Sequence, residues 1–218
     1  MRALILVGSG RYADPWHPLA RTGDRLGEVI ADAGFEVRVR DDVDDALAEL
    51  DGLDLLVVNA ADPWRNGEAA VGAPERSIAG LDAALERGMG VLGVHAAISS
   101  LRDYPRWAET IGGVWLPELS MHPPIGQAHV RIVADHPVTD DVADFEVFDE
   151  LYSRLQRIGD ASVLAEHEHD GRRHPLLWAR EIGGCRVVYD ALGHDERSYD
   201  APEHRRLVRN AARWAVRD

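Results

Sequence analysis

Lysine is absent from this chain. All 24 basic residues are arginine, they are outnumbered by 38 acidic residues, and the formal net charge at neutral pH is −14. The absence of lysine excludes Schiff-base chemistry and the lysine of a phosphate-binding loop. The excess of negative charge argues against nucleic acid or an anionic membrane surface as a partner, because both would repel the protein.

Cysteine and long apolar runs are also scarce. Cys185 is the single cysteine among 218 residues, which excludes an internal disulfide and a multi-cysteine metal site. It lies in a strand-like run, where a buried small side chain is expected rather than a reactive thiol. No apolar run approaches the roughly 20 residues that span a bilayer. Residues 1–8 are too short for a signal peptide and predict a first strand instead. We therefore expect a cytoplasmic protein.

The apolar periodicity predicts one α/β domain over residues 1–218. The predicted strands are 2–7, 35–39, 53–59, 91–94, 127–134, 162–167, 176–182 and 186–191. The predicted helices are 19–33, 44–50, 74–87, 104–111 and 202–216. Strands and helices alternate in the first half, which implies right-handed crossovers and a parallel sheet. Ligands of such sheets bind where the strands end, so the loops at 8–17 and 59–64 should lie near residue 95.

The most informative stretch is Gly88–Ala97, an apolar run framed by glycines that ends at His95. Small residues flank His95 at a strand end before a predicted helix. This is the pattern of a nucleophile elbow, where the backbone turns sharply, although such elbows carry Ser or Cys. We expect His95 to lie in the functional site, as a base near neutral pH or as a hydrogen-bond donor. The alternative is a core histidine bonded to the backbone.

Five motifs follow one another along the chain. They are Gly93-Val94-His95-Ala96-Ala97, Asp135-His136-Pro137-Val138-Thr139, Asp149-Glu150-Leu151-Tyr152, His174-Pro175-Leu176-Leu177-Trp178, and Gly184–Tyr189 continued by Leu192-Gly193-His194. This ordered set, which covers essentially the whole chain, resembles the ThuA-like (trehalose utilisation) family. The resemblance implies a flavodoxin-like three-layer sandwich with a mainly parallel sheet, similar to class I glutamine amidotransferases, and extra β-rich elements in the second half. It also implies carbohydrate catabolism, around trehalose, related disaccharides or their oxidised (3-keto) forms.

The chain departs from both groups at particular positions. An amidotransferase would carry a cysteine at position 95 and a His-x-Glu motif after a late strand. His95 replaces that nucleophile, while His194-Asp195-Glu196 keeps part of the late motif. Hydrolysis of glutamine through a thioester is therefore excluded. Many family members have a histidine-rich loop after the first strand, to which His17 is only a loose match.

Four residues are predicted to be catalytic. His95 and His194 each follow a predicted core strand, so both should lie at the same edge of the sheet. Asp149 and Glu150 are neighbours, so only one of them can face a pocket from an extended segment. Glu150 shares its face with Tyr152, and we predict these two to join the histidines.

The predicted substrate-binding residues are mostly aromatic, because aromatic faces pack against the apolar side of sugar rings. They are Trp16, His17, Trp64, His122 and Trp178. Trp178 lies within a predicted strand and fits the core equally well. His122 lies in a proline-flanked loop, where it could act as a ligand or as part of a lid.

Binding of a metal ion is the alternative explanation for the presence of 10 histidines. His167-Glu168-His169 lacks a third ligand nearby, and His167, His169 and His174 are expected at the surface around a hairpin turn. A site made from His95, His122 and His194 is conceivable, but the spacing does not require it. No cofactor is firmly implied, and a divalent metal is kept as an alternative.

Three functions fit the sequence. The first is an enzyme that acts on a disaccharide or its 3-keto derivative by acid–base chemistry of histidine and carboxylate, as a lyase, isomerase or hydrolase. The second is a non-catalytic sugar-binding or regulatory module, and the third is a metal-dependent hydrolase. In each case the expected partner is a small carbohydrate, and a homo-oligomer is expected only by analogy with the family.

Overall fold

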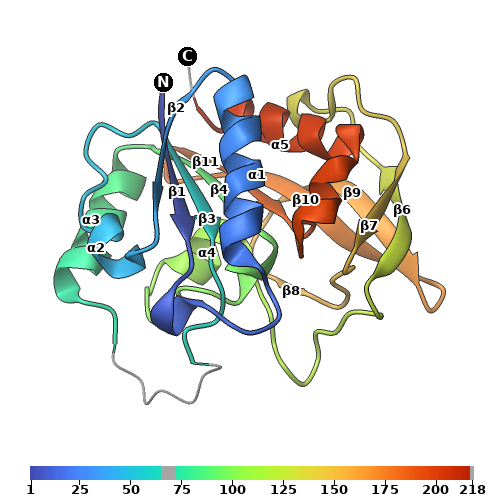
Figure 1. Cartoon of the computed structure of the whole chain (residues 1–218), viewed down its shortest axis with the longest axis horizontal. Coiled ribbons are helices and arrows are strands. Elements are labelled where there is room, and N and C mark those ends of the chain that lie inside the picture. Colours follow the sequence, from blue (N-terminus) through green and yellow to red (C-terminus); the bar gives the residue numbers. More distant parts are fainter. Residues whose placement is uncertain (65–71, 217–218) are drawn as a thin grey trace.

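A mixed β-sheet runs through the computed structural model, which describes residues 1–64 and 72–216 (Figure 1). Within these residues the sheet has nine strands in the order β2-β1-β3-β4-β11-β10-β9-β6-β7. In chain order they are β1 (Arg2–Val7), β2 (Glu36–Arg40), β3 (Leu55–Asn59), β4 (Gly90–Val94), β6 (Gly126–Ile132), β7 (Phe145–Asp149), β9 (Ser162–His169), β10 (Arg172–Ile182) and β11 (Cys185–Asp190). A separate ribbon pairs β5 (Gly113–Val114) with β8 (Gln156–Arg157).

The two halves of the sheet differ in direction. The strands from β2 to β11 pair in parallel, whereas β10, β9, β6 and β7 pair antiparallel. Every residue of β3 and β4 is buried, as expected for apolar strands covered on both faces. The predicted α/β fold, with a parallel sheet and a β-rich second half, is confirmed.

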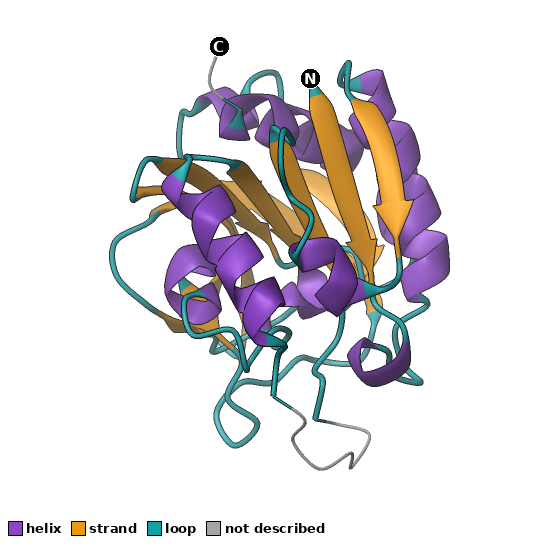
Figure 2. Cartoon of the chain, turned by 90° about the vertical axis from the view of Figure 1, so that its left-hand side faces the viewer, coloured by secondary structure: helices purple, strands orange, loops and turns teal. Residues whose placement is uncertain are grey.

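Helices cover both faces of the sheet (Figure 2). On one face α1 (Leu19–Asp32) packs against α5 (Pro202–Ala215), and on the other lie α2 (Val43–Leu47), α3 (Glu75–Glu86) and α4 (Trp107–Ile111). The apolar stripes of α1 and α5 are buried against the strands, which accounts for their helical periodicity. Cys185 is buried as predicted. Among the described residues, no helix has both the length and the apolar character needed to cross a membrane.

Gly90 lies where the sheet and α5 approach each other closely. A Cβ atom at this position would lie 2.5 Å from the carbonyl oxygen of Ala215. Backbone yields less easily than the end of a side chain, so we expect Gly90→Ala to lower the free energy of unfolding by about 1–3 kcal/mol. Urea denaturation at neutral pH measures the change.

Gly27, in the middle of α1, provides the matched control. A Cβ built there would meet nothing within 4 Å apart from its chain neighbours and the backbone of its own helix. Gly27→Ala should therefore raise the free energy of unfolding by about 0.5–1 kcal/mol, because alanine is the better helix former. Equal effects of the two substitutions would contradict the role assigned to the Gly90 contact.

Candidate functional site

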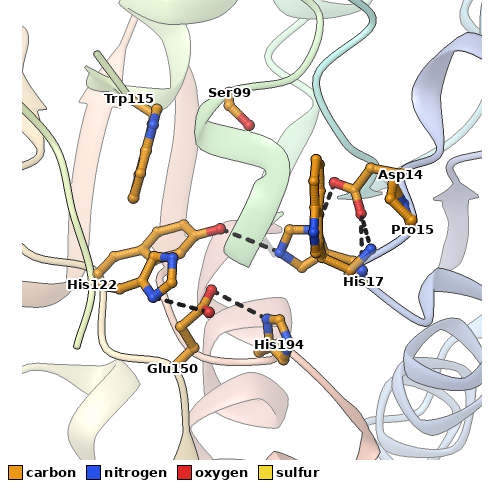
Figure 3. Close-up of a pocket in the computed structure, with 10 residues that line it drawn as sticks. Asp14, Pro15, His17, Ser99, Trp115, His122, Glu150 and His194 are labelled. Carbon is orange, nitrogen blue, oxygen red and sulfur yellow. Dashed lines mark hydrogen bonds and ion pairs between the residues drawn. The ribbon is translucent and has the colours of Figure 1, made fainter. Parts of the chain in front are cut away.

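A pocket of about 520 Å³ opens at the edge of the sheet where the parallel strands end (Figure 3). Its walls come from the loop after β1, the loop after β4, the segments flanking β5 and β7, and the loop after β11. The described lining residues are Asp14, Pro15, Trp16, His17, Ser99, Trp115, His122, Glu150, Tyr152 and His194. Segments far apart in the sequence therefore meet at this edge, as the parallel topology requires.

The sharp turn predicted at His95 is present. His95 directly follows β4, has a φ of +45° and begins the short 3-10 helix η2 (His95–Ile98), where a helix was expected to follow it. Positive φ is unfavourable for a residue with a side chain and persists only where the surroundings enforce it. Here the hydroxyl of Tyr189 in β11 donates to the carbonyl oxygen of His95 at 2.8 Å, which supports the turn.

The ring of His95 is buried and its tautomer follows from its neighbours. Nδ1 lies 2.7 Å from the carbonyl oxygen of Ala191, so it must be the protonated nitrogen that donates there. In the neutral ring the lone pair is then on Nε2. This atom has no hydrogen-bond partner in the described part of the chain, and an oxygen of Glu150 lies 3.6 Å away.

His17 is held in the same way by a neighbouring carboxylate. Its Nδ1 lies 2.7 Å from Oδ2 of Asp14, and Oδ1 of Asp14 accepts the backbone N–H groups of Trp16 and His17. Burial lowers the pKa of His17 and outweighs the opposing effect of Asp14. His17 is therefore neutral near pH 7, with Nδ1 as donor and the lone pair on Nε2, which lies 3.5 Å from the hydroxyl of Tyr152.

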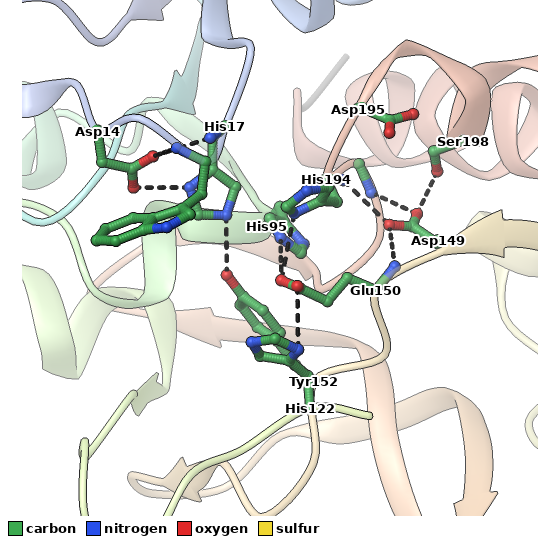
Figure 4. A network of polar contacts seen from close by, with 12 residues as sticks. Asp14, His17, His95, His122, Asp149, Glu150, Tyr152, His194, Asp195 and Ser198 are labelled. Atoms are coloured by element: carbon green, nitrogen blue, oxygen red, sulfur yellow. Dashed lines mark hydrogen bonds and ion pairs between the residues drawn. The ribbon is translucent and has the colours of Figure 1, made fainter. Parts of the chain in front are cut away.

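Glu150 lies at the centre of the histidines (Figure 4). Its Oε1 is 3.0 Å from Nδ1 of His122, and its Oε2 is 3.2 Å from Nδ1 of His194. Burial opposes ionisation of Glu150, but its contacts with His122, His194 and His95 outweigh burial and hold its pKa well below the usual range. The carboxylate is therefore ionised.

His194 completes the arrangement. Burial disfavours its charged form, but the nearby Glu150 carboxylate outweighs burial and raises the pKa of His194. One ligand atom from each of His17, His95, Glu150 and His194 lies within 4.8 Å of the others. These four residues, which we call the His/Glu cluster, could hold a metal ion.

A family model described as trehalose utilisation, ThuA, matches residues 2–215. This chain belongs to the ThuA family. No curated protein matches it.

Solved structures show the same fold. A ThuA-like protein from Parabacteroides merdae has a TM-score of 0.80 at 18% identity, and the match covers 98% of this chain and 89% of that one. A protein from Salmonella typhimurium described as cytoplasmic has a TM-score of 0.67 at 14% identity, with both chains fully covered. A glutamine amidotransferase from Thermotoga maritima has a TM-score of 0.57 at 12% identity, covering 100% of this chain and 98% of that one.

Most of the predicted site residues of this ThuA protein meet in the pocket. His95, His194, Glu150 and Tyr152 lie together, and the ring centroids of His95 and Tyr152 are 4.1 Å apart. As expected, only Glu150 of the acidic pair enters the pocket. His122 contacts Glu150 but is not part of the His/Glu cluster. The sequence suggested His122 as a possible metal ligand, and the cluster contains His17 instead.

The predicted aromatic surface is only partly present. Trp16 lines the pocket mouth and is 55% exposed. Trp64 is exposed but is not among the lining residues, and the guanidinium of Arg102 lies over its ring. Trp178 is fully buried, and its Nε1 donates to the carbonyl oxygen of Ile111, so its prediction as a sugar-stacking residue is wrong.

Four lining residues were missed in the sequence: Asp14, Pro15, Ser99 and Trp115. Asp14 holds His17 across a spacing of three residues, and this Asp-x-x-His pattern in the loop after the first strand could have shown the pair. Trp115 lines the pocket beside Tyr152, with ring centroids 4.6 Å apart. Trp115 follows the strand β5, which is too short to show an alternating apolar pattern in the sequence.

His167 and His174 are buried rather than on the surface, so that expectation is wrong for both. The hairpin of β9 and β10 is longer than predicted, and it places the two residues opposite each other beneath the segment that carries Tyr152. Nε2 of His167 lies 3.1 Å from the carbonyl oxygen of Tyr152. Burial lowers the pKa of His167 to about 4.

This burial predicts a pH dependence of stability. The unfolded chain protonates a histidine near pH 6.5, so the stabilisation from neutral His167 is complete above about pH 6.5 and is lost as the pH falls toward 4. His167→Gln keeps a donor for Tyr152 but cannot take up a proton. Between pH 7 and 5 we expect the wild type to lose about 2 kcal/mol more unfolding free energy than this variant. Parallel curves of stability against pH, measured by urea denaturation, would contradict the burial of a neutral His167.

Proposed function

We propose that this ThuA protein is a metal-dependent enzyme of carbohydrate catabolism that acts on a disaccharide or its oxidised (3-keto) derivative. The observation that carries the proposal is the buried Nε2 atom of His95, which has no hydrogen-bond partner among the described residues and lies 3.6 Å from an oxygen of Glu150. Buried polar atoms are nearly always paired, so an atom without a partner inside a cluster of ligand-type residues favours a bound ion. A cytoplasmic location belongs to the same proposal.

The donor set fits a divalent transition metal. Imidazole nitrogens with one carboxylate oxygen suit Zn²⁺ and its first-row neighbours. The Nδ1 atoms of His17 and His95 are fixed by Asp14 and by a backbone carbonyl, which is how metal-binding histidines are usually oriented. Ligands of tetrahedral zinc lie about 3.3 Å apart. Oε2 of Glu150 is 3.2 Å from His194 and 3.6 Å from His95, which supports the fit.

A divalent ion held there would polarise a sugar carbonyl or hydroxyl as a Lewis acid. The chain's own residues bind and orient the sugar around that point. Trp16 and Trp115 offer aromatic faces to a pyranose ring. The hydroxyl of Tyr152 reaches the pocket beside His17, where it can pass a proton to or from the substrate. The lining residues of the described chain include no arginine, which suits an uncharged sugar.

Acid–base chemistry without a metal is the second candidate. The contact between His194 and Glu150 favours it, because a histidine with a raised pKa next to an ionised carboxylate is a ready proton donor. Both candidates use the same residues, so a metal-binding measurement separates them.

The first test is metal binding by the purified, chelator-treated protein, measured by calorimetry and elemental analysis with Zn²⁺, Mn²⁺ and Ni²⁺. We expect one ion per chain, with an affinity that His95→Ala lowers at least about 100-fold, because the loss of a direct ligand should exceed the effect of its supporting residues. The control is His129→Ala, an exposed histidine on β6 that pairs with Glu146. A wild type that takes up no metal, or equal binding by the His95→Ala and His129→Ala variants, would refute the metal site.

The second test concerns Tyr152. Removing its hydroxyl leaves the His/Glu cluster intact, so Tyr152→Phe should bind metal as the wild type does. Turnover of trehalose, or of its 3-keto form, should fall by about 10²–10⁴-fold, the usual contribution of a positioned proton donor. Product formation is followed by chromatography with and without metal. Unchanged turnover in Tyr152→Phe would exclude the proton-transfer role.

A further inference from the structure

A chain of buried polar residues lies behind the His/Glu cluster, outside the residues that line the pocket. It consists of Asp149 at the end of β7, Ser198 in the short helix η4 (Glu196–Asp200), His204 in α5, and Asp190 at the end of β11. Each of these residues is at most 2% exposed. Four buried polar side chains in contact call for an explanation, because burying charged groups is unfavourable unless they pair and hydrogen-bond with one another.

The hydrogen bonds define where the protons lie. The hydroxyl of Ser198 has one hydrogen, which it donates to Oδ2 of Asp149. Nδ1 of His204, 2.9 Å from that hydroxyl oxygen and 3.1 Å from the carbonyl oxygen of Ser198, must therefore be a donor. Nε2 of His204 lies 2.9 Å from Oδ2 of Asp190 and also donates. With both nitrogens donating, His204 is an imidazolium between two carboxylates.

This chain has the residue types of a Ser-His-Asp triad but not its function. Ser198 is fully buried, and its hydroxyl hydrogen is bound to Asp149 rather than to the histidine. A serine nucleophile needs access to substrate and a histidine that accepts its proton. Here His204 donates to Ser198, and Ser198 donates to Asp149.

Asp149 receives three backbone N–H groups as well (Figure 4). Oδ1 accepts from Glu150 at 2.7 Å and from His194 at 3.1 Å, and Oδ2 accepts from Gly193 at 2.8 Å. Two of these donors belong to residues of the His/Glu cluster, which come from segments more than 40 residues apart. A single carboxylate thus connects the backbone of Glu150 to the backbone of His194.

We propose that Asp149 is a positioning residue, oriented by Ser198 and the buried His204–Asp190 pair, that sets the separation of Glu150 and His194 and thereby the geometry of the His/Glu cluster. Its effect on metal binding rests on the proposed function, whereas its effect on the two backbone segments does not. Residues that support metal ligands typically change metal affinity about 10–100-fold when they are removed.

The test compares Asp149→Asn with Asp195→Asn. An amide at position 149 presents an N–H group to one of the donors around it, so at least one of its hydrogen bonds must break. Asp195 is the matched control, because it lies in the loop that holds Gly193 and His194 but its carboxylate accepts from the backbone and side chain of Arg197. We expect Asp149→Asn to weaken metal binding about 10–100-fold and to alter the visible spectrum of the Co²⁺-loaded protein, and Asp195→Asn to change neither.

A measurement on the metal-free protein tests the same proposal independently. Amide hydrogen exchange followed by NMR should show the N–H groups of Gly193 and His194 exchanging at least about 10-fold faster in Asp149→Asn. The N–H of Val188, inside β11, should be unchanged. Ser198→Ala removes one hydrogen bond to Asp149 and keeps the three backbone donors, so it should show the same changes at smaller size and serves if Asp149→Asn does not fold.

The outcomes separate the two proposals. Faster exchange at Gly193 and His194 in a protein that binds no metal would refute the proposed function and support the positioning role. Wild-type exchange and wild-type metal affinity in both variants would overturn the positioning role. Acceleration that includes Val188 to the same extent would also overturn it, because the loss would then be one of global stability.

Discussion

The site depends on the burial of one ionised carboxylate, that of Glu150. Removing such a group from water is unfavourable unless charges and hydrogen bonds surround it. Three histidines from three different segments approach its two oxygens. Contacts from all three segments therefore stabilise the buried carboxylate, and these contacts in turn hold the three segments together. A cation at the same position would meet the same requirement more completely.

The fold contributes a sharp turn at the end of the central strand β4, and the residue at this turn is His95. The positive φ of His95, supported by Tyr189, places a side chain at the end of the central strand. A thiol there would be a nucleophile, whereas an imidazole with its Nδ1 bound to the backbone offers only a lone pair. The likeness of fold therefore carries no conclusion about the reaction.

Much of the architecture follows from the sequence, because strands such as β3 and β4 are apolar throughout and α1 and α5 have one apolar face. The same local rules placed His95 at a turn and separated Glu150 from Asp149 by face. These local rules do not predict which loops meet at the end of the sheet.

His17, Trp178 and His167 show this limit in three ways. His17 joins the cluster only because Asp14 orients it, and nothing in its periodicity marks the loop as ordered. Trp178 and His167 lie on strands whose partners bury them, and a bulge between β9 and β10 shifts the register that alternation alone would assume. Long-range strand pairing decided the positions of Trp178 and His167.

The two candidate chemistries require different protonation states of one nitrogen, Nδ1 of His194. Nδ1 of His194 faces Glu150 and, without a metal, is the site of the extra proton that Glu150 stabilises. A metal ion needs the same nitrogen deprotonated, so an ion and that proton exclude each other. The neutral His17 and the ionised Glu150 already have the protonation states that a metal requires. The proton on His194 is therefore what separates the proposed metal site from the proposed acid–base chemistry.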